Sequence, residues 1–203
     1  MKIICIGRNY GAHIKELNSK TPEEPMFFLK PDSAVLLNQH PFVIPEFSKE
    51  VHYEVEVLVK INKLGKYIQP KFAHKYYDKI GLGIDFTARD LQRKCKEGGL
   101  PWEMAKAFDG SAVIGGWLPK EELGDISDLN FSLEKNNEKV QEGSTRDMLF
   151  NIDEIIAYVS QFMTLKIGDV IFTGTPKGVG PVAIDDKLTG YLSGKQMFAI
   201  NIK

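Results

Sequence analysis

Two glutamates stand two residues apart in the clearest predicted strand of the chain. Apolar residues alternate with other residues over 51–62 (VHYEVEVLVKIN), and Glu54 and Glu56 occupy the same side of that alternation. A period of two indicates a β-strand, on which both side chains would point to one face with their Cα atoms about 7 Å apart. Two carboxylates at that spacing can converge on one divalent cation. The polar face of an ordinary amphipathic strand has the same pattern, so both interpretations stay open.

A third carboxylate, Asp85, lies near the end of the apolar strand predicted over 80–86. It could coordinate a cation, or it could cap the helix predicted over 87–96. Three carboxylates without a neighbouring cysteine or histidine cluster form a set of hard oxygen ligands. Such a set suits Mg²⁺, Mn²⁺ or Ca²⁺ better than Zn²⁺.

His13 and Glu16 are spaced three residues apart in a short helix predicted over 12–17. This spacing places both side chains on one helix face, where they can form a hydrogen bond. A carboxylate partner orients an imidazole and raises its basicity, which is the arrangement used for general-base catalysis. A surface ion pair has the same spacing. The other histidines lack such a neighbour in the sequence, and we expect them to be structural or solvated.

Two further segments combine polar groups with apolar or glycine-rich surroundings. Lys106 lies within the stretch 99–108 (GLPWEMAKAF), so its ammonium either reaches solvent or meets an anion. Near a cation site, it could stabilise developing negative charge. The segment 173–181 (TGTPKGVGP) lacks the phosphate-loop motifs. It fits either a turn that offers backbone N–H groups and the Thr175 hydroxyl to a small carboxylate, or an ordinary tight turn.

The composition excludes several classes of protein. The 203 residues include 26 Lys and Arg against 27 Asp and Glu, for a formal net charge of −1. This balance argues against a nucleic-acid-binding protein and against a polybasic membrane-surface protein. The two cysteines, Cys5 and Cys95, form no C-x-x-C pair and predict reduced structural thiols. No apolar run approaches the ~18 residues of a membrane span, and we expect a cytoplasmic protein.

Strands outnumber helices among the predicted elements. Beyond those named above, short strands are expected over 3–6, 26–29, 34–37, 130–133, 169–173, 187–191 and 197–202, and a helix over 153–163. Few β-α-β alternations occur, which predicts a β-rich α+β domain with a sheet or barrel at its centre. Without a linker or an internal repeat, residues 1–203 are expected to form one domain.

Six short motifs follow one another along the chain. They are GRNY at 7–10, the His13–Glu16 pair, HYEVE at 52–56, GIDFTARDLQ at 83–92, GLPWEMAKAF at 99–108 and TGTPKGVG at 173–180. In this order they resemble the fumarylacetoacetate hydrolase superfamily, and within it the small single-domain acylpyruvase and oxaloacetate decarboxylase branch. The resemblance implies a β-rich α+β fold built around a rolled, barrel-like mixed sheet with a few short helices. It also implies a homodimer.

The resemblance assigns roles to residues of this chain by position. The implied ligands of a Mg²⁺ or Mn²⁺ ion are Glu54, Glu56 and Asp85. The implied catalytic residues are the dyad of His13 and Glu16, together with Lys106. The implied substrate-binding residues are Arg8, Lys30, Arg89, Gln92 and Thr175.

The implied activity is that of a C–C bond hydrolase or decarboxylase acting on small 2-oxo acids, such as acylpyruvates and oxaloacetate, through a metal-bound enolate. An isomerase of the 2-hydroxyhepta-2,4-diene-1,7-dioate type is the alternative. A non-catalytic dicarboxylate-binding protein is a third reading, against which the intact ligand and dyad positions argue. The short chain shows no sign of the extra N-terminal domain of true fumarylacetoacetate hydrolases, so we do not expect fumarylacetoacetate itself as substrate.

The segment around the dyad is expected to move. Gly7 and Gly11 flank the junction between the first strand and the predicted helix, and TPEEP at 21–25 is incompatible with a longer helix. A helix of two turns needs tertiary support to be stable. We predict that residues 11–24 form a short helix and loop that closes over bound substrate and carries the dyad into place.

Overall fold

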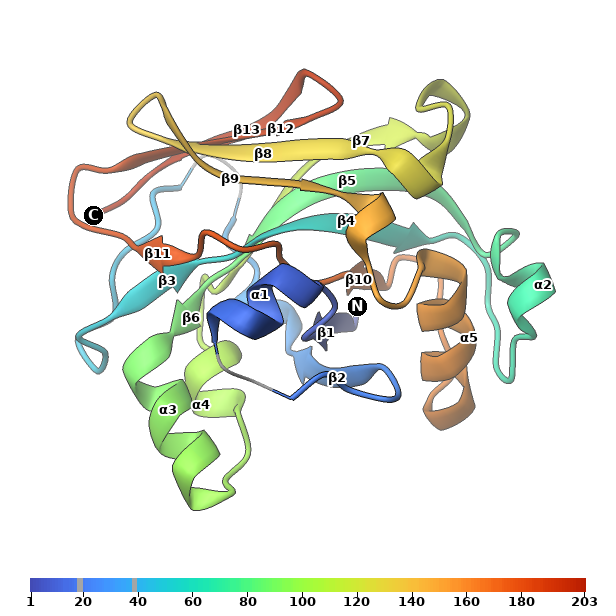
Figure 1. Ribbon diagram of the computed structural model, residues 1–203, viewed down its shortest axis with the longest axis horizontal. Helices are drawn as coiled ribbons and strands as arrows, with labels where there is room; N and C mark the ends of the chain where they lie inside the picture. The colour runs from blue at the N-terminus through green and yellow to red at the C-terminus, as the bar shows by residue number, and fades with distance from the viewer. Residues whose placement is uncertain (18–19, 38–39) are drawn as a thin grey trace.

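The computed structural model describes residues 1–17, 20–37 and 40–203 of the chain (Figure 1). Its largest sheet has six strands in the order β2-β1-β10-β4-β5-β7. Strands β1 and β10 pair in parallel, and the other neighbours are antiparallel, so the sheet is mixed. The six strands are β1 (Ile3–Gly7), β2 (Met26–Lys30), β4 (Val55–Ile61), β5 (Tyr77–Asp85), β7 (Ala112–Pro119) and β10 (Val170–Phe172).

Two smaller sheets complete the strand-rich α+β fold that the sequence predicts. One has the order β13-β12-β8-β9, and the other β11-β3-β6. The sheets share one core and do not close into a barrel. Their strands are β3 (Val51–Tyr53), β6 (Thr87–Ala88), β8 (Asn130–Lys135), β9 (Glu138–Ser144), β11 (Gly180–Pro181), β12 (Lys187–Leu192) and β13 (Lys195–Asn201).

Short helices surround the sheets. Figure 1 shows α1 in front of the centre of the molecule, α3 and α4 together at one end, and α2 and α5 at the other. Helix α5 begins with a capping box in which Asn151 and Glu154 each bond to the other's backbone N–H. The helices are α1 (Gly11–Glu16), α2 (Pro70–Ala73), α3 (Arg89–Gly98), α4 (Glu103–Lys106) and α5 (Ile152–Phe162). The 3₁₀ helices are η1 (Asp32–Ala34), η2 (Lys120–Glu122), η3 (Ile126–Asp128) and η4 (Thr145–Asp147).

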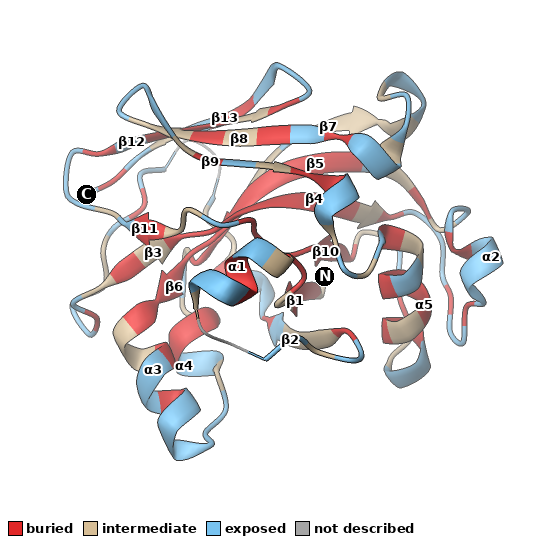
Figure 2. Ribbon diagram, viewed as in Figure 1, coloured by how far each residue is buried: buried red, intermediate tan, exposed pale blue. Residues whose placement is uncertain are grey.

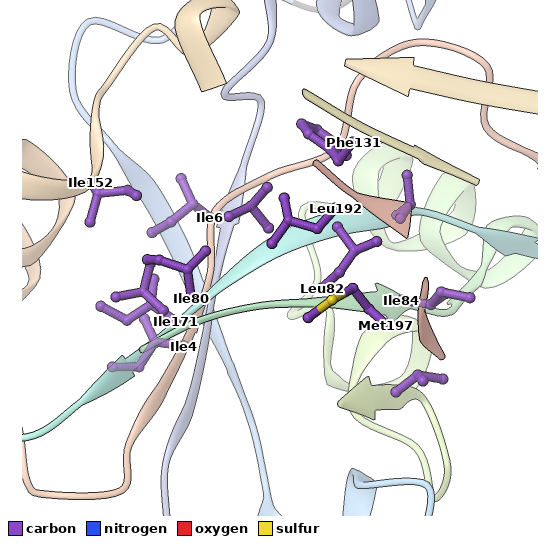
Figure 3. Packing of buried hydrophobic residues seen from close by; sticks show 14 of the residues in the cluster. Ile4, Ile6, Ile80, Leu82, Ile84, Phe131, Ile152, Ile171, Leu192 and Met197 are labelled. Atoms are coloured by element: carbon purple, nitrogen blue, oxygen red, sulfur yellow. The ribbon is translucent and has the colours of Figure 1, made fainter. Parts of the chain in front are cut away.

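The central strands β4 and β5 are buried on both faces (Figure 2). Val55, Val57 and Val59 join the main apolar cluster, whereas Leu58 belongs to a second cluster on the opposite side of the sheet. Figure 3 shows the main cluster, in which Ile80, Leu82 and Ile84 of β5 lie near Ile4, Ile171 and Met197. The alternation over residues 51–62 therefore does not mark a solvent-exposed face, and the amphipathic-strand interpretation of Glu54 and Glu56 is wrong.

Several predicted elements differ in detail from the observed ones. Residues 34–37 form no strand. Pro31 leads into η1, and only a single bridge between Val35 and Ala112 follows. The strand predicted over 51–62 is interrupted at Glu54 and divides into β3 and β4.

Strand β7 is not predicted from the sequence, because it carries two consecutive glycines, which have a low β propensity. A Cβ atom on Gly115 would lie 2.6 Å from the carbonyl oxygen of Leu82 in the adjacent strand, so the sequence there reflects close packing rather than β propensity.

Asp169 joins the start of β1 to the turn before β10. Its carboxylate accepts hydrogen bonds from the backbone N–H groups of Lys2 (2.8 Å) and Lys166 (2.7 Å), and from the Lys2 ammonium. Burial alone would raise the pKa of Asp169, but these bonds outweigh it and lower the pKa. We expect Asp169→Asn to lower the free energy of unfolding at pH 7 by about 2 kcal/mol.

The pH dependence of that loss follows from the lowered pKa. The ionised carboxylate stabilises the folded state fully above the unfolded pKa of about 4, and this contribution disappears as the pH falls through the lower folded-state value. Urea unfolding of both proteins at pH 7 and near pH 2.5 measures it. The difference between wild type and variant should shrink at the acidic pH. An equal difference at both pH values would contradict this role for the charge.

Candidate metal centre and active site

Three buried carboxylates meet where β4 and β5 run side by side. Glu54 occupies the break before β4, Glu56 lies on β4, and Asp85 ends β5, where its N–H donates to the Glu54 carbonyl oxygen (2.9 Å). One carboxylate oxygen from each residue lies within 4.8 Å of the other two. The three side chains belong to residues that are 5%, 2% and 1% exposed. Asp85 does not cap α3, whose N-cap is Ala88, so the capping interpretation is wrong.

Cations of the protein compensate two of these carboxylates. The Lys106 ammonium lies between Glu54 (2.7 Å to Oε2) and Asp85 (2.8 Å to Oδ2). Arg89 pairs with the other oxygen of Glu54, and Lys30 lies 2.7 Å from Oδ1 of Asp85. Burial opposes ionisation of Glu54, but Lys106 and Arg89 outweigh it and hold the pKa of Glu54 well below its usual range. Glu54 is therefore ionised at neutral pH.

Lys106 is buried and does not reach solvent. Burial alone would lower the pKa of Lys106, but Asp85 and Glu54 outweigh it and raise the pKa to about 12. The side chain is therefore a permanent positive charge at neutral pH. This excludes Lys106 as a general base and leaves it the role of stabilising negative charge.

Glu56 forms no ion pair with any residue that the structure describes. Its Oε2 accepts a hydrogen bond from the backbone N–H of Gly174 (2.7 Å). Burial, Asp85 and Glu54 raise the pKa of the Glu56 carboxyl well above its usual range, and so favour its neutral form. A divalent cation would reverse that preference. Because the three residues offer only oxygen atoms, they fit a hard ion such as Mg²⁺ or Mn²⁺.

A small cavity of about 30 Å³ opens beside the carboxylates and is lined in part by His13 and Ile14 of α1. The cavity brings together most of the site residues predicted from the sequence, and its polar lining includes Arg8, His13, Arg89, Gln92, Lys106 and Thr175. Lys30 lies behind this set, at the end of β2, where its ammonium also donates to Ser111 Oγ (2.9 Å). The apolar side is formed by residues such as Ile14, Phe28 and Trp102.

The histidine of the histidine–glutamate pair lines this cavity, whereas Glu16 is exposed and lies outside the lining. His13 is 6% exposed, and its Nδ1 lies 2.9 Å from Oε2 of Glu16. The other oxygen of Glu16 accepts from the Gly178 N–H (3.0 Å), which connects α1 to the glycine-rich segment. Since Nδ1 faces a carboxylate, the neutral ring carries its proton on Nδ1 and its lone pair on Nε2.

One face of α3 supplies a line of polar groups. Arg89 donates to Gln92 Oε1 (2.6 Å) and to Nδ1 of His52 (3.4 Å). The Nε2 atom of His52 lies 2.9 Å from Glu50, so His52 does have a carboxylate partner, two residues away, and its contacts with Glu50 and Arg89 fit the structural role expected of it. Lys96, seven residues after Arg89 on the same face, was missed in the sequence because helix periodicity alone does not show what faces a cavity.

Arg8 combines a left-handed backbone conformation with a buried side-chain nitrogen that has no hydrogen-bond partner among the described residues. Its φ angle of 58° lies in the left-handed region, directly after β1 ends. Its Nε atom is buried and has no hydrogen-bond partner among the described residues. A strained residue that presents an unpaired donor to a cavity indicates a binding position.

Part of one prediction lies outside what the structure describes. The predicted mobile segment 11–24 includes residues 18 and 19, which are not among the described residues. The closing movement of this segment therefore stays a prediction.

Cys5 and Cys95 are free and buried, as expected. None of the described helices combines the length and apolar character needed to cross a bilayer.

Comparison with known proteins gives a consistent family. The family described as "Fumarylacetoacetate (FAA) hydrolase C-terminal" matches residues 2–200. An oxaloacetate tautomerase of Escherichia coli (strain K12) is 43% identical over 197 residues, covering 97% of this chain and 90% of that protein. The mitochondrial oxaloacetate tautomerase of Bos taurus is 42% identical over 192 residues, covering 95% and 87%.

Solved structures agree with the sequence relatives. A fumarylacetoacetate hydrolase family protein from Yersinia pestis CO92 is 41% identical with a TM-score of 0.95, covering 100% of this chain and 93% of that one. Fumarylpyruvate hydrolase from Pseudomonas aeruginosa, in complex with Mn²⁺ and pyruvate, is 34% identical with a TM-score of 0.93, covering 100% and 89%.

Proposed function

The chain belongs to the fumarylacetoacetate hydrolase family, and from that premise we propose that it is a divalent-cation-dependent enzyme that acts on small 2-oxo acids, oxaloacetate first among them. The observation that carries the proposal is the set of three buried carboxylates beside a cavity that is also lined by Lys106 and by the histidine of the His13–Glu16 pair. The complex of the Pseudomonas aeruginosa enzyme with Mn²⁺ and pyruvate supports both the cation and the ligand class.

The relatives favour one reaction on that site. The sequence alone ranked acylpyruvate hydrolysis and oxaloacetate decarboxylation first and did not include oxaloacetate tautomerisation. Two relatives above 40% identity are named oxaloacetate tautomerases, so we place interconversion of enol and keto oxaloacetate first. Decarboxylation and acylpyruvate hydrolysis follow as second candidates, because a relative from Dictyostelium discoideum is named oxaloacetate decarboxylase and the Pseudomonas neighbour is a fumarylpyruvate hydrolase.

The residues around the cavity account for the proton transfer. A cation held by Glu54, Glu56 and Asp85 would supply Lewis-acid polarisation of the 2-oxo group. Lys106 holds its positive charge beside the same carboxylates, where it stabilises negative charge that develops on the substrate oxygen as C3 loses a proton. This charge stabilises the transition state without a cost of reorganisation, because its ion pairs with Glu54 and Asp85 already hold the Lys106 ammonium in place.

His13 and Glu16 supply the base. With its proton on Nδ1 facing Glu16, His13 offers Nε2 to accept the proton from C3, and Glu16 stabilises the imidazolium that forms. Return of that proton to the substrate oxygen, directly or through water, gives the enol. In acylpyruvate hydrolysis the same nitrogen would instead take a proton from the attacking water.

Two cations without an acidic partner favour a substrate with two carboxylates. Arg8 and Lys96 line the cavity, and neither forms an ion pair with any described residue. Lys96 is exposed at the cavity mouth, where its ammonium lies 5.6 Å from the Trp102 ring centroid. The first carboxylate of a 2-oxo acid would lie toward the cation, which leaves the second for these side chains.

A substrate panel tests the proposed function. We expect turnover of oxaloacetate that requires Mg²⁺ or Mn²⁺ and stops in a chelator, with weaker turnover of acylpyruvates and hydroxy-diene acids. Absence of metal-dependent turnover of any 2-oxo acid, with binding retained, would instead support a non-catalytic dicarboxylate-binding protein. Preferred turnover of hydroxy-diene acids would support the isomerase alternative.

Removing the Lys96 charge tests the preference for two carboxylates. Lys96→Met should raise the KM for oxaloacetate about tenfold, because a charge-assisted hydrogen bond is lost. The KM for acetylpyruvate, which has one carboxylate, should change less than about twofold on the same argument. Lys94→Met, on the exposed side of the same helix, is the matched control. Equal effects on both substrates would contradict the assignment of Lys96.

We further propose that residues 1–203 form a single catalytic domain and that two chains form a homodimer. The family resemblance supports both. Light scattering over a range of concentrations would measure the mass in solution, and a constant monomer mass would contradict the dimer. The expectation of a cytoplasmic location stays a prediction, because the relatives include proteins named as mitochondrial.

A further inference from the structure

Gln141 reaches the active site from a different sheet. It lies on β9 and is 2% exposed. Its Oε1 accepts from the backbone N–H of Val55 (2.9 Å), while its Nε2 donates to the Pro176 carbonyl oxygen (3.0 Å) and to Thr175 Oγ1 (3.0 Å). A backbone N–H can only donate and a carbonyl can only accept, so these two partners fix which end of the amide is oxygen and which is nitrogen.

The orientation of the amide determines the orientation of the Thr175 hydroxyl. Because Thr175 Oγ1 accepts a hydrogen bond from Gln141 Nε2, the Thr175 hydroxyl group is left to donate its own hydrogen bond to another group. No described residue accepts it, although Thr175 is 4% exposed and lines the cavity. Thr173, two residues earlier, differs, because its hydroxyl donates to the carbonyl oxygen of Val57 (2.9 Å). The Thr175 proton is thus left for an acceptor inside the cavity.

The same amide holds the strand that carries the carboxylates. Val55 lies between Glu54 and Glu56, and β10 pairs with β4 only over Leu58 to Lys60. Beyond the end of β10, Gln141 provides the acceptor for the Val55 N–H. Gly174, next to Thr175, donates to Glu56. Gln141 therefore connects the strand that carries the carboxylates, through Val55, to the glycine-rich segment, through Thr175 and Pro176.

We propose that Gln141 is a positioning residue, which presents the Thr175 hydroxyl as a hydrogen-bond donor to an anionic oxygen of the bound 2-oxo acid. The ligand class rests on the proposed function, whereas the direction of the hydrogen bond rests on the contacts of Gln141 alone. Thr175 touches the ligand, and Gln141 acts through it.

The substitution Gln141→Glu reverses the polarity of this contact at almost constant shape. Glutamate keeps an acceptor for Val55 N–H but loses the donor, so the Thr175 hydroxyl would donate to the new carboxylate instead of to the ligand. The readout is the Kd for oxalate, an unreactive dicarboxylate, measured by calorimetry on Mn²⁺-loaded protein. We expect Gln141→Glu and Thr175→Val each to raise this Kd about tenfold, as expected for one lost hydrogen bond to a charged group.

The double variant distinguishes positioning from a simple charge effect. If Gln141 acts through the hydroxyl, Gln141→Glu should have little further effect once Thr175 is valine, and its full effect should return with Thr175→Ser, which keeps the hydroxyl. An undiminished effect of Gln141→Glu in the valine background would overturn the proposal, because repulsion of the anion would then explain it. Gln196→Glu, exposed on β13 of the same sheet, controls for added charge.

Two further measurements keep this test separate from that of the proposed function. Mn²⁺ affinity and the unfolding midpoint of each variant show whether the site and the fold are intact, and either one changing as much as the oxalate Kd would overturn a positioning role. Failure of the wild-type protein to bind oxalate in the presence of Mn²⁺ would overturn both the proposed function and this inference. Binding by wild type with additive variant effects would overturn this inference alone.

Discussion

Glu56→Gln should lower metal affinity and metal-dependent turnover by at least about a hundredfold while leaving the cation-free fold as stable as wild type. The reason lies in the surroundings of this carboxyl. Burial and the two neighbouring carboxylates raise the pKa of Glu56 and so favour its neutral form when no cation is bound. A neutral amide of the same shape should therefore replace it at little cost. An oxygen of the amide can still accept from the Gly174 N–H.

Thermal unfolding with and without Mg²⁺ measures both halves of this prediction. Wild type should gain stability when the ion is added, since a ligand that binds only the folded state stabilises it. Glu56→Gln should start from the same midpoint and gain little. A variant that kept wild-type Mg²⁺ affinity would show that Glu56 is not a ligand.

Glu54→Gln provides the contrast. Glu54 pairs with Lys106 and Arg89, and all three side chains are buried. Removing its charge leaves Arg89 without a carboxylate partner and Lys106 paired with Asp85 alone, and breaking a buried ion pair costs about 3–5 kcal/mol in comparable cases. We therefore expect this variant to be less stable even without a cation, unlike Glu56→Gln. Equal stability of the two variants in the absence of metal would contradict the charge distribution described for this site.

His13→Ala should reduce acylpyruvate hydrolysis and oxaloacetate tautomerisation by about 10²–10⁴-fold, the usual contribution of a general base. Both reactions require proton transfer that the imidazole performs. Decarboxylation does not require an activated water, so we expect a smaller loss in that reaction. Binding of oxalate to the Mn²⁺-loaded protein should stay within a few-fold of wild type, because Lys106 lies on α4 and the carboxylates lie on or next to β4 and β5, and none of them belongs to α1.

Two variants control for indirect effects of this change. Glu16→Gln keeps the imidazole in place but weakens its orientation, and its rates should lie between those of wild type and His13→Ala. His74→Ala, on an exposed histidine after α2, should leave every rate unchanged. Wild-type hydrolysis by His13→Ala would exclude the dyad from the mechanism.

The sequence predicted those parts of the site that depend on local spacing. The alternation over 51–62 predicted that Glu54 and Glu56 converge, and they do, although Glu54 lies in the break between β3 and β4. The three-residue spacing placed His13 beside Glu16, where the structure also has it. Most strands were found from short apolar runs. These features depend on residues within a few positions of one another.

Features that depend on distant residues were not predictable in the same way. Whether Glu54 and Glu56 face solvent or the interior depends on the sheets packed around β4. Lys106 bridges Glu54 and Asp85 across 52 and 21 positions of the chain, and Gln141 meets Thr175 across 34. No local pattern in β9 marks Gln141, because its role comes from the register of a second sheet.

A crystal structure of the protein grown with Mn²⁺ and oxalate tests the central claim most directly, since the anomalous signal of manganese locates the ion without assumptions about its ligands. We expect one ion per chain, with oxygen atoms of Glu54, Glu56 and Asp85 at about 2 Å and oxalate completing its coordination. An ion bound elsewhere, or oxalate bound in the cavity with no ion among these three carboxylates, would contradict the claim.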